Sequence, residues 1–343
     1  MNAAARGLFD KAPQALDTHE AWLLAVLLRA PGAAPRAVAA RACALSRVHG
    51  AGADCTVLGA RAESALARAP RVRSHVALAP HLAARLLQAK GDLRTTLDAE
   101  VQRSAQRALT SQLAQLAEQR VRDGAVLVVD NASGEVLAWV GSSGELSASP
   151  RVDFVRARRQ AGSTLKPFLY ALAFEQRTLT PASLLDDSPL ELPTGLGSYR
   201  PLNYDLRFHG PVPARIALGS SLNVPAVRVL ERVGVDRAVI ALRGLGVAGL
   251  ERADYYGPSL ALGSADVTLY ELVSAYRALA RGGVAGSLRV RAEDAPSGSE
   301  RVLSAGAAFL VADILADRGS RSLTFGLESA VATRFWSAVS YHL

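Results

Sequence analysis

The segment from Gly162 to Pro167 (Gly-Ser-Thr-Leu-Lys-Pro) constrains the fold more than any other part of this sequence. Proline is tolerated only in the first turn of an α-helix, because further along it removes a backbone hydrogen bond and clashes with the preceding turn. The apolar residues around it have the spacing of one face of an amphipathic helix: Leu165, Phe168, Leu169 and Leu172. Ser163 is therefore predicted at the helix N-terminus, with Lys166 about one turn later on the same face.

Lysine is scarce in this chain, which makes Lys166 informative. Of 39 Lys and Arg residues only three are lysines, Lys11, Lys90 and Lys166. A lysine kept in an apolar stretch indicates a task that arginine cannot perform, and arginine cannot lose its proton. The positive end of a helix dipole also disfavours a nearby ammonium. These features favour a neutral Lys166 acting as a base beside a nucleophilic Ser163, although Ser-x-x-Lys also occurs by chance at ordinary helix starts.

A second motif, Ser221-Leu222-Asn223, follows the apolar run Ile216 to Leu218. Its hydroxyl and amide would complete a serine acyltransferase site without histidine, with Ser221 relaying a proton and Asn223 binding both the lysine and a substrate amide. Taken alone, Ser and Asn are more simply explained as helix caps.

Together the two motifs resemble those of penicillin-binding proteins and serine β-lactamases. The resemblance is strongest to class A penicillin-binding proteins of the 1C type, and it runs from about Thr95 to Trp336. Four blocks carry it, the first with Ala161 in place of the usual proline: Arg159–Phe168, Asn203–Asp205, Phe208–Val212 and Ser221–Val227.

This resemblance implies an α+β fold of the transpeptidase and serine β-lactamase type, a five-stranded antiparallel sheet with helices on both sides. It implies a peptidoglycan D,D-transpeptidase without cofactor or metal, acting on stem peptides and acylated by β-lactams. Ser163 would attack the carbonyl, Lys166 would act as base, Ser221 would relay the proton, and Asn223 would orient Lys166 and the substrate amide.

Three regions are expected along the chain. Residues 1–45 are predicted to form helices at Asp17–Leu28, with Thr18 as the candidate cap, and at Ala34–Leu45. They resemble the end of the family's glycosyltransferase domain. Glycosyl transfer requires a positioned pair of carboxyl groups, and the acids of this segment are better explained as caps and surface charges, so no glycosyltransferase activity is expected. Residues 46–94, rich in Ala, Arg and Pro, are predicted to be a linker, and 95–343 the transpeptidase domain.

Within that domain the pattern predicts a long helix from Thr95 to about Arg120. A β-hairpin follows, with strands at Ala125–Asp130 and Glu135–Val140 joined by a turn. Further helices are expected near Asp266–Ala280 and Ser304–Ala316.

Composition excludes several classes of protein. No apolar run approaches the length of a membrane span, and no signal peptide is recognisable. The net charge is +8, but the arginines are scattered at helix-face spacing without interleaved aromatics, so nucleic acid is not an expected partner. Cys43 and Cys55 match no metal spacing, and unpaired thiols are the default expectation, although their pairing cannot be judged from sequence.

The family's third motif, Lys-Thr-Gly, is missing. Its expected lead-in is present as Ala332–Val339, but Ser340-Tyr341-His342-Leu343 follows, and no lysine occurs after Lys166. We therefore expect a domain that is incomplete at its C-terminus and impaired as an enzyme. The intact family works at the periplasmic face of the inner membrane, and the location of this chain, which carries no anchor, stays open.

Two alternatives remain. One is a non-catalytic fragment of an interrupted gene, and the other is a D,D-carboxypeptidase or β-lactamase-like hydrolase that uses water as acceptor. An out-of-frame Lys-Thr-Gly in the DNA just after Val339 would indicate an interrupted gene.

Overall fold

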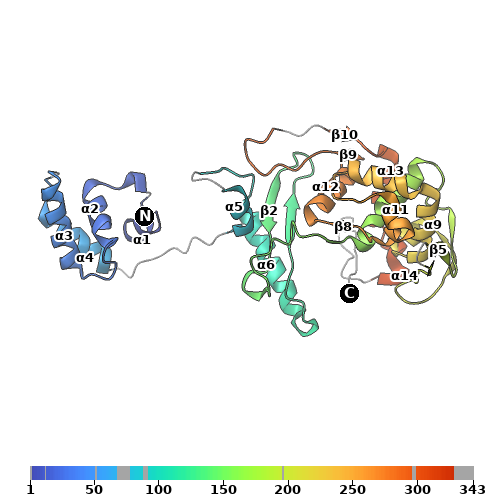
Figure 1. Ribbon diagram of the computed structural model, residues 1–343, viewed down its shortest axis with the longest axis horizontal. Helices are drawn as coiled ribbons and strands as arrows, with labels where there is room; N and C mark the ends of the chain where they lie inside the picture. The colour runs from blue at the N-terminus through green and yellow to red at the C-terminus, as the bar shows by residue number, and fades with distance from the viewer. Residues whose placement is uncertain are drawn as a thin grey trace. The chain divides into compact units, whose positions relative to one another are not determined.

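The structure is a computed structural model that describes residues 2–11, 13–50, 52–67, 78–87, 92–194, 197–295 and 299–327. The chain divides into two compact units, Met1–Ala77 and Leu78–Leu343. The first unit carries the bluest ribbon in Figure 1, and its helices are α1 (Asn2–Phe9), α2 (Thr18–Leu27), α3 (Pro35–Val48) and α4 (Cys55–Ala67).

The first unit packs α2, α3 and α4 around a small core. Leu23, Val38 and Leu58 are almost fully buried there, one from each helix. Helix α2 begins with a capping box, in which the Asp17 side chain accepts from the Glu20 N–H at 3.0 Å and Glu20 accepts from the Asp17 N–H at 2.9 Å. The helix cap is therefore Asp17, and the expectation of Thr18 was wrong.

A disulfide joins Cys43 of α3 to Cys55, the first residue of α4, with the two Cα atoms 5.3 Å apart. The default expectation of unpaired thiols was therefore wrong. Helix α4 and helix α5 (Pro80–Leu86) both lie in the stretch for which the sequence predicts a linker. The proposed boundaries at 45 and 94 stay predictions.

The second unit contains a hairpin of β1 (Val126–Val129) and β2 (Val136–Val140), paired antiparallel with Val126 opposite Val140. The predicted hairpin is confirmed. Helix α6 (Ala99–Gln115) covers one face of it, where Ala105 packs with Ala138, and Figure 1 shows α6 beside β2. The Asp98 side chain caps α6 by accepting from the Glu100 and Val101 N–H groups at 2.8 and 2.9 Å.

The other face of the hairpin packs against α5 and helix α12 (Leu269–Ala280). Val136 and Trp139 point to this side and contact a cluster that includes Leu82 and Tyr270. A hydrophobic residue on each side of both strands is expected for a sheet that is covered on both faces.

The largest core of the second unit surrounds helix α7 (Lys166–Glu175). Every residue from Lys166 to Phe174 is buried. The sequence predicted an amphipathic helix here, and the difference arises because other helices cover α7 on all sides, as expected for a helix that is apolar all round. These helices are α8 (Ala214–Gly219), α9 (Asn223–Val233), α10 (Val235–Gly244) and α13 (Ala305–Ala316), and short helices α11 (Ala253–Tyr256) and α14 (Ser322–Phe325) lie further out.

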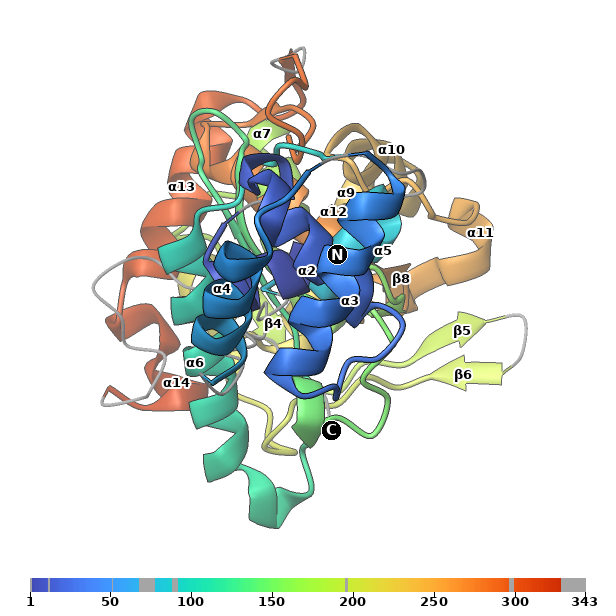
Figure 2. The same cartoon turned by 90° about the vertical axis from the view of Figure 1, so that its left-hand side faces the viewer.

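The remaining strands form short antiparallel pairs. They are β3 (Arg159–Gln160) with β8 (Asp266–Val267), β4 (Leu184–Asp187) with β7 (Gly210–Pro213), β5 (Leu192–Thr194) with β6 (Gly197–Tyr199), and β9 (Val284–Ala285) with β10 (Glu300–Arg301). The β5–β6 hairpin extends away from the other elements in Figure 2.

The five-stranded sheet is not seen among the described residues, where each sheet has two strands. An isolated bridge places Arg289 beside Glu135, next to the edge strand β2. The predicted strand start from Phe335 to Val339 lies outside the described residues.

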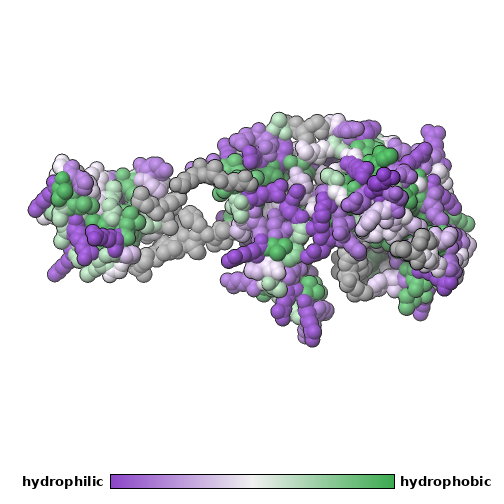
Figure 3. Space-filling view, in the orientation of Figure 1, coloured by the Kyte–Doolittle hydropathy of each residue, from purple (hydrophilic) through white to green (hydrophobic). Residues whose placement is uncertain are grey.

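Hydrophilic side chains cover most of the visible surface over α6 in Figure 3. Among the described helices, none is both long enough and apolar enough to cross a membrane.

Candidate active site

Ser163 lies in a single 3₁₀ turn, η4 (Gly162–Leu165), directly before α7. The Lys166 N–H donates to the Ser163 carbonyl, so the two residues are one turn apart, and Pro167 occupies the first turn of α7 as predicted. Ser163 is half-buried, and within the described part of the chain its hydroxyl has no hydrogen-bond partner.

Close backbone contact holds the start of this turn. The Gly162 N–H donates to the Gly263 carbonyl at 3.1 Å, and the Ala161 N–H donates to the Ala265 carbonyl at 2.9 Å. Gly263 has a φ of +75°, and a Cβ atom there would lie 2.0 Å from the Gly162 oxygen. Only glycine has both the conformational freedom and the absence of a side chain that this crossing requires.

The other side of the turn is held by Tyr276 of α12. Its hydroxyl donates to the Thr164 carbonyl at 2.8 Å, and its ring meets Phe168 edge-on. Burial raises the pKa of the Tyr276 hydroxyl above its ordinary value, so the group acts as a proton donor in this hydrogen bond.

Lys166 is 1% exposed, and its amine meets three oxygen atoms. Nζ lies 2.6 Å from the Ser221 carbonyl oxygen, 3.2 Å from Ser221 Oγ and 2.6 Å from Asn223 Oδ1. Burial lowers the pKa of Lys166 to about 7, because a charged amine loses its hydration in a dry interior. The structure thus brings three of the four predicted site residues into contact, with Ser163 one turn away.

Ser221 lies in the sharp connection between α8 and α9. Its φ is +55°, a left-handed conformation that is uncommon for residues other than glycine. This conformation follows the end of α8 and precedes the extended Leu222, so that the carbonyl and hydroxyl of one residue both reach Lys166. Such backbone strain is characteristic of functional sites.

The orientation of the Asn223 amide is determined by its contacts. Nδ2 donates to the Leu202 carbonyl at 2.8 Å, which leaves Oδ1 to accept from Lys166. The two ends of an amide are distinguished by such partners. The Asn223 backbone N–H donates in turn to Asn203 Oδ1 at 2.8 Å.

Asn203 and Asp187 support this arrangement, and the sequence did not indicate their contact. Asp187 is fully buried, and both of its oxygens accept from Asn203 Nδ2, at 2.9 and 2.8 Å. In the sequence, the Asn203-Tyr204-Asp205 block is marked only by the family resemblance. Nothing local in the Leu-Leu-Asp-Asp sequence of β4 (Leu184–Asp187) marks Asp187 as a buried member of this contact.

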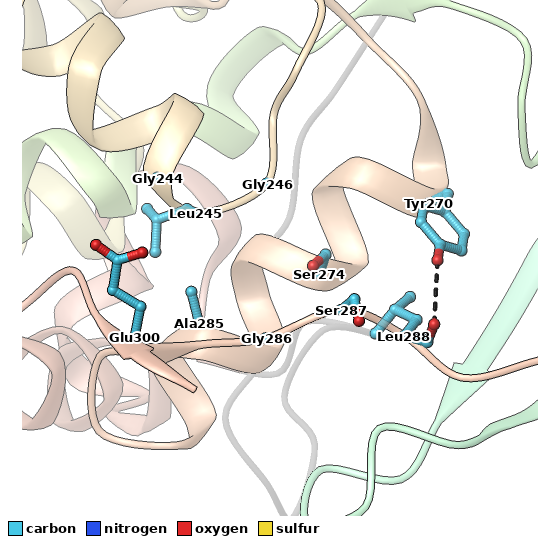
Figure 4. Close-up of a pocket in the computed structure, with 10 residues that line it drawn as sticks. All are labelled: Gly244, Leu245, Gly246, Tyr270, Ser274, Ala285, Gly286, Ser287, Leu288 and Glu300. Atoms are coloured by element: carbon cyan, nitrogen blue, oxygen red, sulfur yellow. Dashed lines mark hydrogen bonds between the residues drawn. The ribbon is translucent and has the colours of Figure 1, made fainter. Parts of the chain in front are cut away.

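A cavity of about 290 Å³ lies at the C-terminal end of α10, beside α12 and β9, and Figure 4 shows its lining. Gly246, Ser274, Leu288 and Glu300 are among the lining residues, and none of the predicted site residues is. Within the described residues, no group of three or more His, Cys, Asp or Glu side chains could hold a metal ion.

Comparison with known proteins identifies the family. The penicillin binding protein transpeptidase domain matches residues 124–326, a span that includes both motifs and the hairpin. The chain belongs to the penicillin-binding transpeptidase family. Its fold is the mixed α and β fold of that family, preceded by a helical N-terminal region.

Among curated proteins, penicillin-binding protein 1C of Escherichia coli strain K12 is 38% identical over 92% of this chain and 42% of its own length. Penicillin-binding protein 1B of Vibrio cholerae is 37% identical over 55% of this chain and 24% of its own length. The chain thus spans less than half of these class A relatives.

Solved structures agree on the fold. The TP domain of Burkholderia pseudomallei penicillin-binding protein 3 superposes with a TM-score of 0.52 at 20% identity, covering 66% of this chain and 71% of that one.

Proposed function

We propose that this chain carries a serine acyltransferase site for peptidoglycan cross-linking, in which Ser163 forms the acyl intermediate. The observation that carries the proposal is the Lys166 amine, fully buried one turn after Ser163 and 2.6 Å from Asn223 Oδ1. The family match supports the same reaction class.

The oxygens around Lys166 suit a neutral amine. An ammonium has three hydrogens to donate, whereas a neutral amine has two hydrogens and a lone pair. The two hydrogens match the Ser221 carbonyl and Asn223 Oδ1, both at 2.6 Å. The third neighbour is a hydroxyl, Ser221 Oγ at 3.2 Å, which is able to donate as well as accept. With the pKa of Lys166 lowered to about 7 by burial, the neutral form is accessible near neutral pH.

In the proposed reaction these residues take the roles that the family resemblance implies. Lys166 takes the proton of Ser163 Oγ as that oxygen bonds to the carbonyl carbon of the penultimate D-Ala of a stem peptide. The bond to the leaving amine breaks, and the Ser221 hydroxyl passes a proton to that amine from Lys166. The amine of a second stem peptide then bonds to the ester carbon and gives up a proton to Lys166, and the bond to Ser163 Oγ breaks as that oxygen regains a proton. Asn223 would orient both Lys166 and the substrate amide.

β-Lactams would acylate the same serine.

The disulfide between Cys43 and Cys55 supports an oxidising location, since such bonds persist in the periplasm and outside the cell but rarely in the cytosol. We propose the periplasmic face of the inner membrane as the place of action.

Labelling with a fluorescent penicillin tests the nucleophile. Covalent label is expected on the wild-type chain and lost in Ser163→Ala. The matched control is Ser104→Ala, which removes a hydroxyl from an exposed position on α6 and should label normally. Label that survives Ser163→Ala would show that another residue is the nucleophile. A folded wild-type chain that takes no label would contradict acyl transfer and favour the non-catalytic alternative.

A further inference from the structure

Two buried residues outside the serine motifs, Asp187 and Asn203, connect to Lys166 through Asn223. We propose that Asp187 and Asn203 are positioning residues that hold the first turn of α9, and with it the Asn223 amide, against the Lys166 amine. This inference rests on the proposed acyltransfer for its consequence on rate, but its structural part can be tested without any reaction.

Asn203 uses every hydrogen-bonding group of its side chain. Nδ2 donates to Asp187 Oδ1 and Oδ2 at 2.9 and 2.8 Å and to the Arg207 carbonyl at 2.7 Å. Oδ1 accepts from the backbone N–H groups of Asn223 at 2.8 Å and Val224 at 3.4 Å. Asn203 is only 3% exposed, and a buried amide with complete partners is fixed in position and rotation.

The Asn203 oxygen acts as a helix cap supplied from a distant part of the chain. The first N–H groups of a helix have no partner within it and are commonly satisfied by the residue just before. In α9 that residue is Leu222, whose side chain cannot accept a hydrogen bond. The neighbouring Leu202 carbonyl binds Asn223 Nδ2 as well, so one two-residue segment holds both the backbone and the side chain of Asn223.

Asp187 anchors this segment. It ends β4 and is 0% exposed, and besides Asn203 it accepts from the His209 N–H at 3.0 Å. The Tyr170 hydroxyl lies nearby on α7, four residues after Lys166. Burial, and to a lesser degree the charge of Asp187, raise the pKa of Tyr170. Asp187 holds the Nδ2 end of the Asn203 side chain, while the Oδ1 end faces α9.

The contacts thus form one continuous path, from Asp187 to Asn203, from Asn203 to Asn223, and from Asn223 to the Lys166 amine. If the first turn of α9 loosens, water reaches Nζ and Asn223 Oδ1 loses its fixed position. The charged form of Lys166 then regains hydration, and its titration midpoint rises toward the ordinary value of 10.5.

The scarcity of lysine makes this midpoint measurable. A chain with three lysines, labelled with ¹³C at lysine Cε, gives three NMR titrations, and Lys166→Met identifies the signal of Lys166. Wild type is compared with Asn203→Ala and with Asn131→Ala, a control at an exposed position in the hairpin turn. The rate of fluorescent penicillin labelling is measured on the same samples.

In Asn203→Ala we expect the Lys166 midpoint to rise by about one pH unit or more. Labelling should slow by about tenfold to a hundredfold, as expected for a displaced catalytic group, and Asn131→Ala should change neither quantity. A folded Asn203→Ala chain with the wild-type midpoint and labelling rate would overturn the proposal. If the midpoint shifts in Asn203→Ala but the wild type takes no label, positioning is supported and acyl transfer is contradicted. If the midpoint and rate are unchanged in Asn203→Ala but labelling depends on Ser163, acyl transfer is supported and positioning is contradicted.

An exchange variant keeps the test decisive if Asn203→Ala does not fold. Asn203→Asp alone places two acids together, whereas the double exchange Asp187→Asn/Asn203→Asp restores an acid–amide pair with an acceptor still facing α9. The exchange should return the midpoint and the labelling rate toward wild type. An exchange variant no closer to wild type than Asn203→Asp would also overturn the proposal.

Discussion

Two neighbouring regions of the second unit each bury an ionisable side chain, and they accommodate it in opposite ways. Asp187 is surrounded by N–H donors, from Asn203 Nδ2 and the His209 backbone. Lys166 meets only neutral oxygens, and no carboxylate among the described residues pairs with it. The N–H donors hold the Asp187 carboxylate in place, whereas burial lowers the pKa of Lys166 and makes its amine available for proton transfer.

The largest expected effect is on the rate of acylation when Lys166 is replaced. Lys166→Met, which keeps the apolar stem without the amine, should slow β-lactam acylation by about 10²–10⁴-fold, the usual contribution of a general base. Lys166→Arg should be equally inactive, because arginine keeps its proton. Stopped-flow or gel-based labelling measures the rate.

Lys11→Arg serves as the control, because Lys11 lies in the first unit and is 40% exposed in its ion pair with Glu20. Acylation by Lys166→Met within about tenfold of wild type would remove the base role, since that loss is below what a general base contributes.

The next effect is on the free energy of unfolding when Asp187 is replaced. Asp187→Ala leaves one buried Asn203 hydrogen and the half-buried His209 N–H without acceptors, at a cost of about 1–3 kcal/mol for the buried group. Urea unfolding measures the loss. Asp186→Ala is the matched control, because Asp186 is more than half exposed and pairs with Arg228 at the surface, where an ion pair contributes at most about 1 kcal/mol. Equal losses in the two variants would show that Asp187 has no special role.

The smallest effect, counted per pH unit, is a dependence of stability on pH. The folded-state pKa of Lys166 is about 7, against an ordinary value of 10.5. Between these values the unfolded chain binds more protons than the folded chain, so the free energy of unfolding rises with pH. The contribution of this one group approaches about 1.4 kcal/mol per pH unit.

Urea unfolding of wild type and Lys166→Met at a series of pH values from 7 to 10 isolates this contribution. The slope should be smaller in the variant, and identical slopes would mean that the folded-state pKa of Lys166 is not lowered. Acylation should likewise rise as the pH passes about 7.

Much of the fold was predictable where structure depends on neighbours in the sequence. Pro167 places the start of α7, the turn from Asn131 to Gly134 joins the hairpin, and Ser304 caps α13 by accepting from the Ala307 N–H. The cap of α2 was also encoded locally. Glu20 follows Asp17 by three residues, the capping-box spacing, and this favours Asp17 over the adjacent Thr18.

The contacts between distant segments were not predictable in the same way. The motifs identified Ser221 and Asn223, and the structure places both at the Lys166 amine, but their catalytic roles stay predictions. Asp187 and Asn203 are each typical turn residues, and nothing local to either shows that they meet in a core. The pairing of Cys43 with Cys55 depends likewise on how α3 and α4 pack, which the weak periodicity of α4 did not indicate.

The crossing of Gly162 and Gly263 has a consequence for how this protein tolerates change. Gly263 belongs to neither serine motif, yet a single methyl group there would occupy the space of the Gly162 oxygen and displace the turn that carries Ser163. The space available for a side chain at residue 263 is thus limited by the backbone of Gly162, which directly precedes Ser163. Libraries of variants of this protein should therefore keep Gly263 unchanged, although it lies outside both serine motifs.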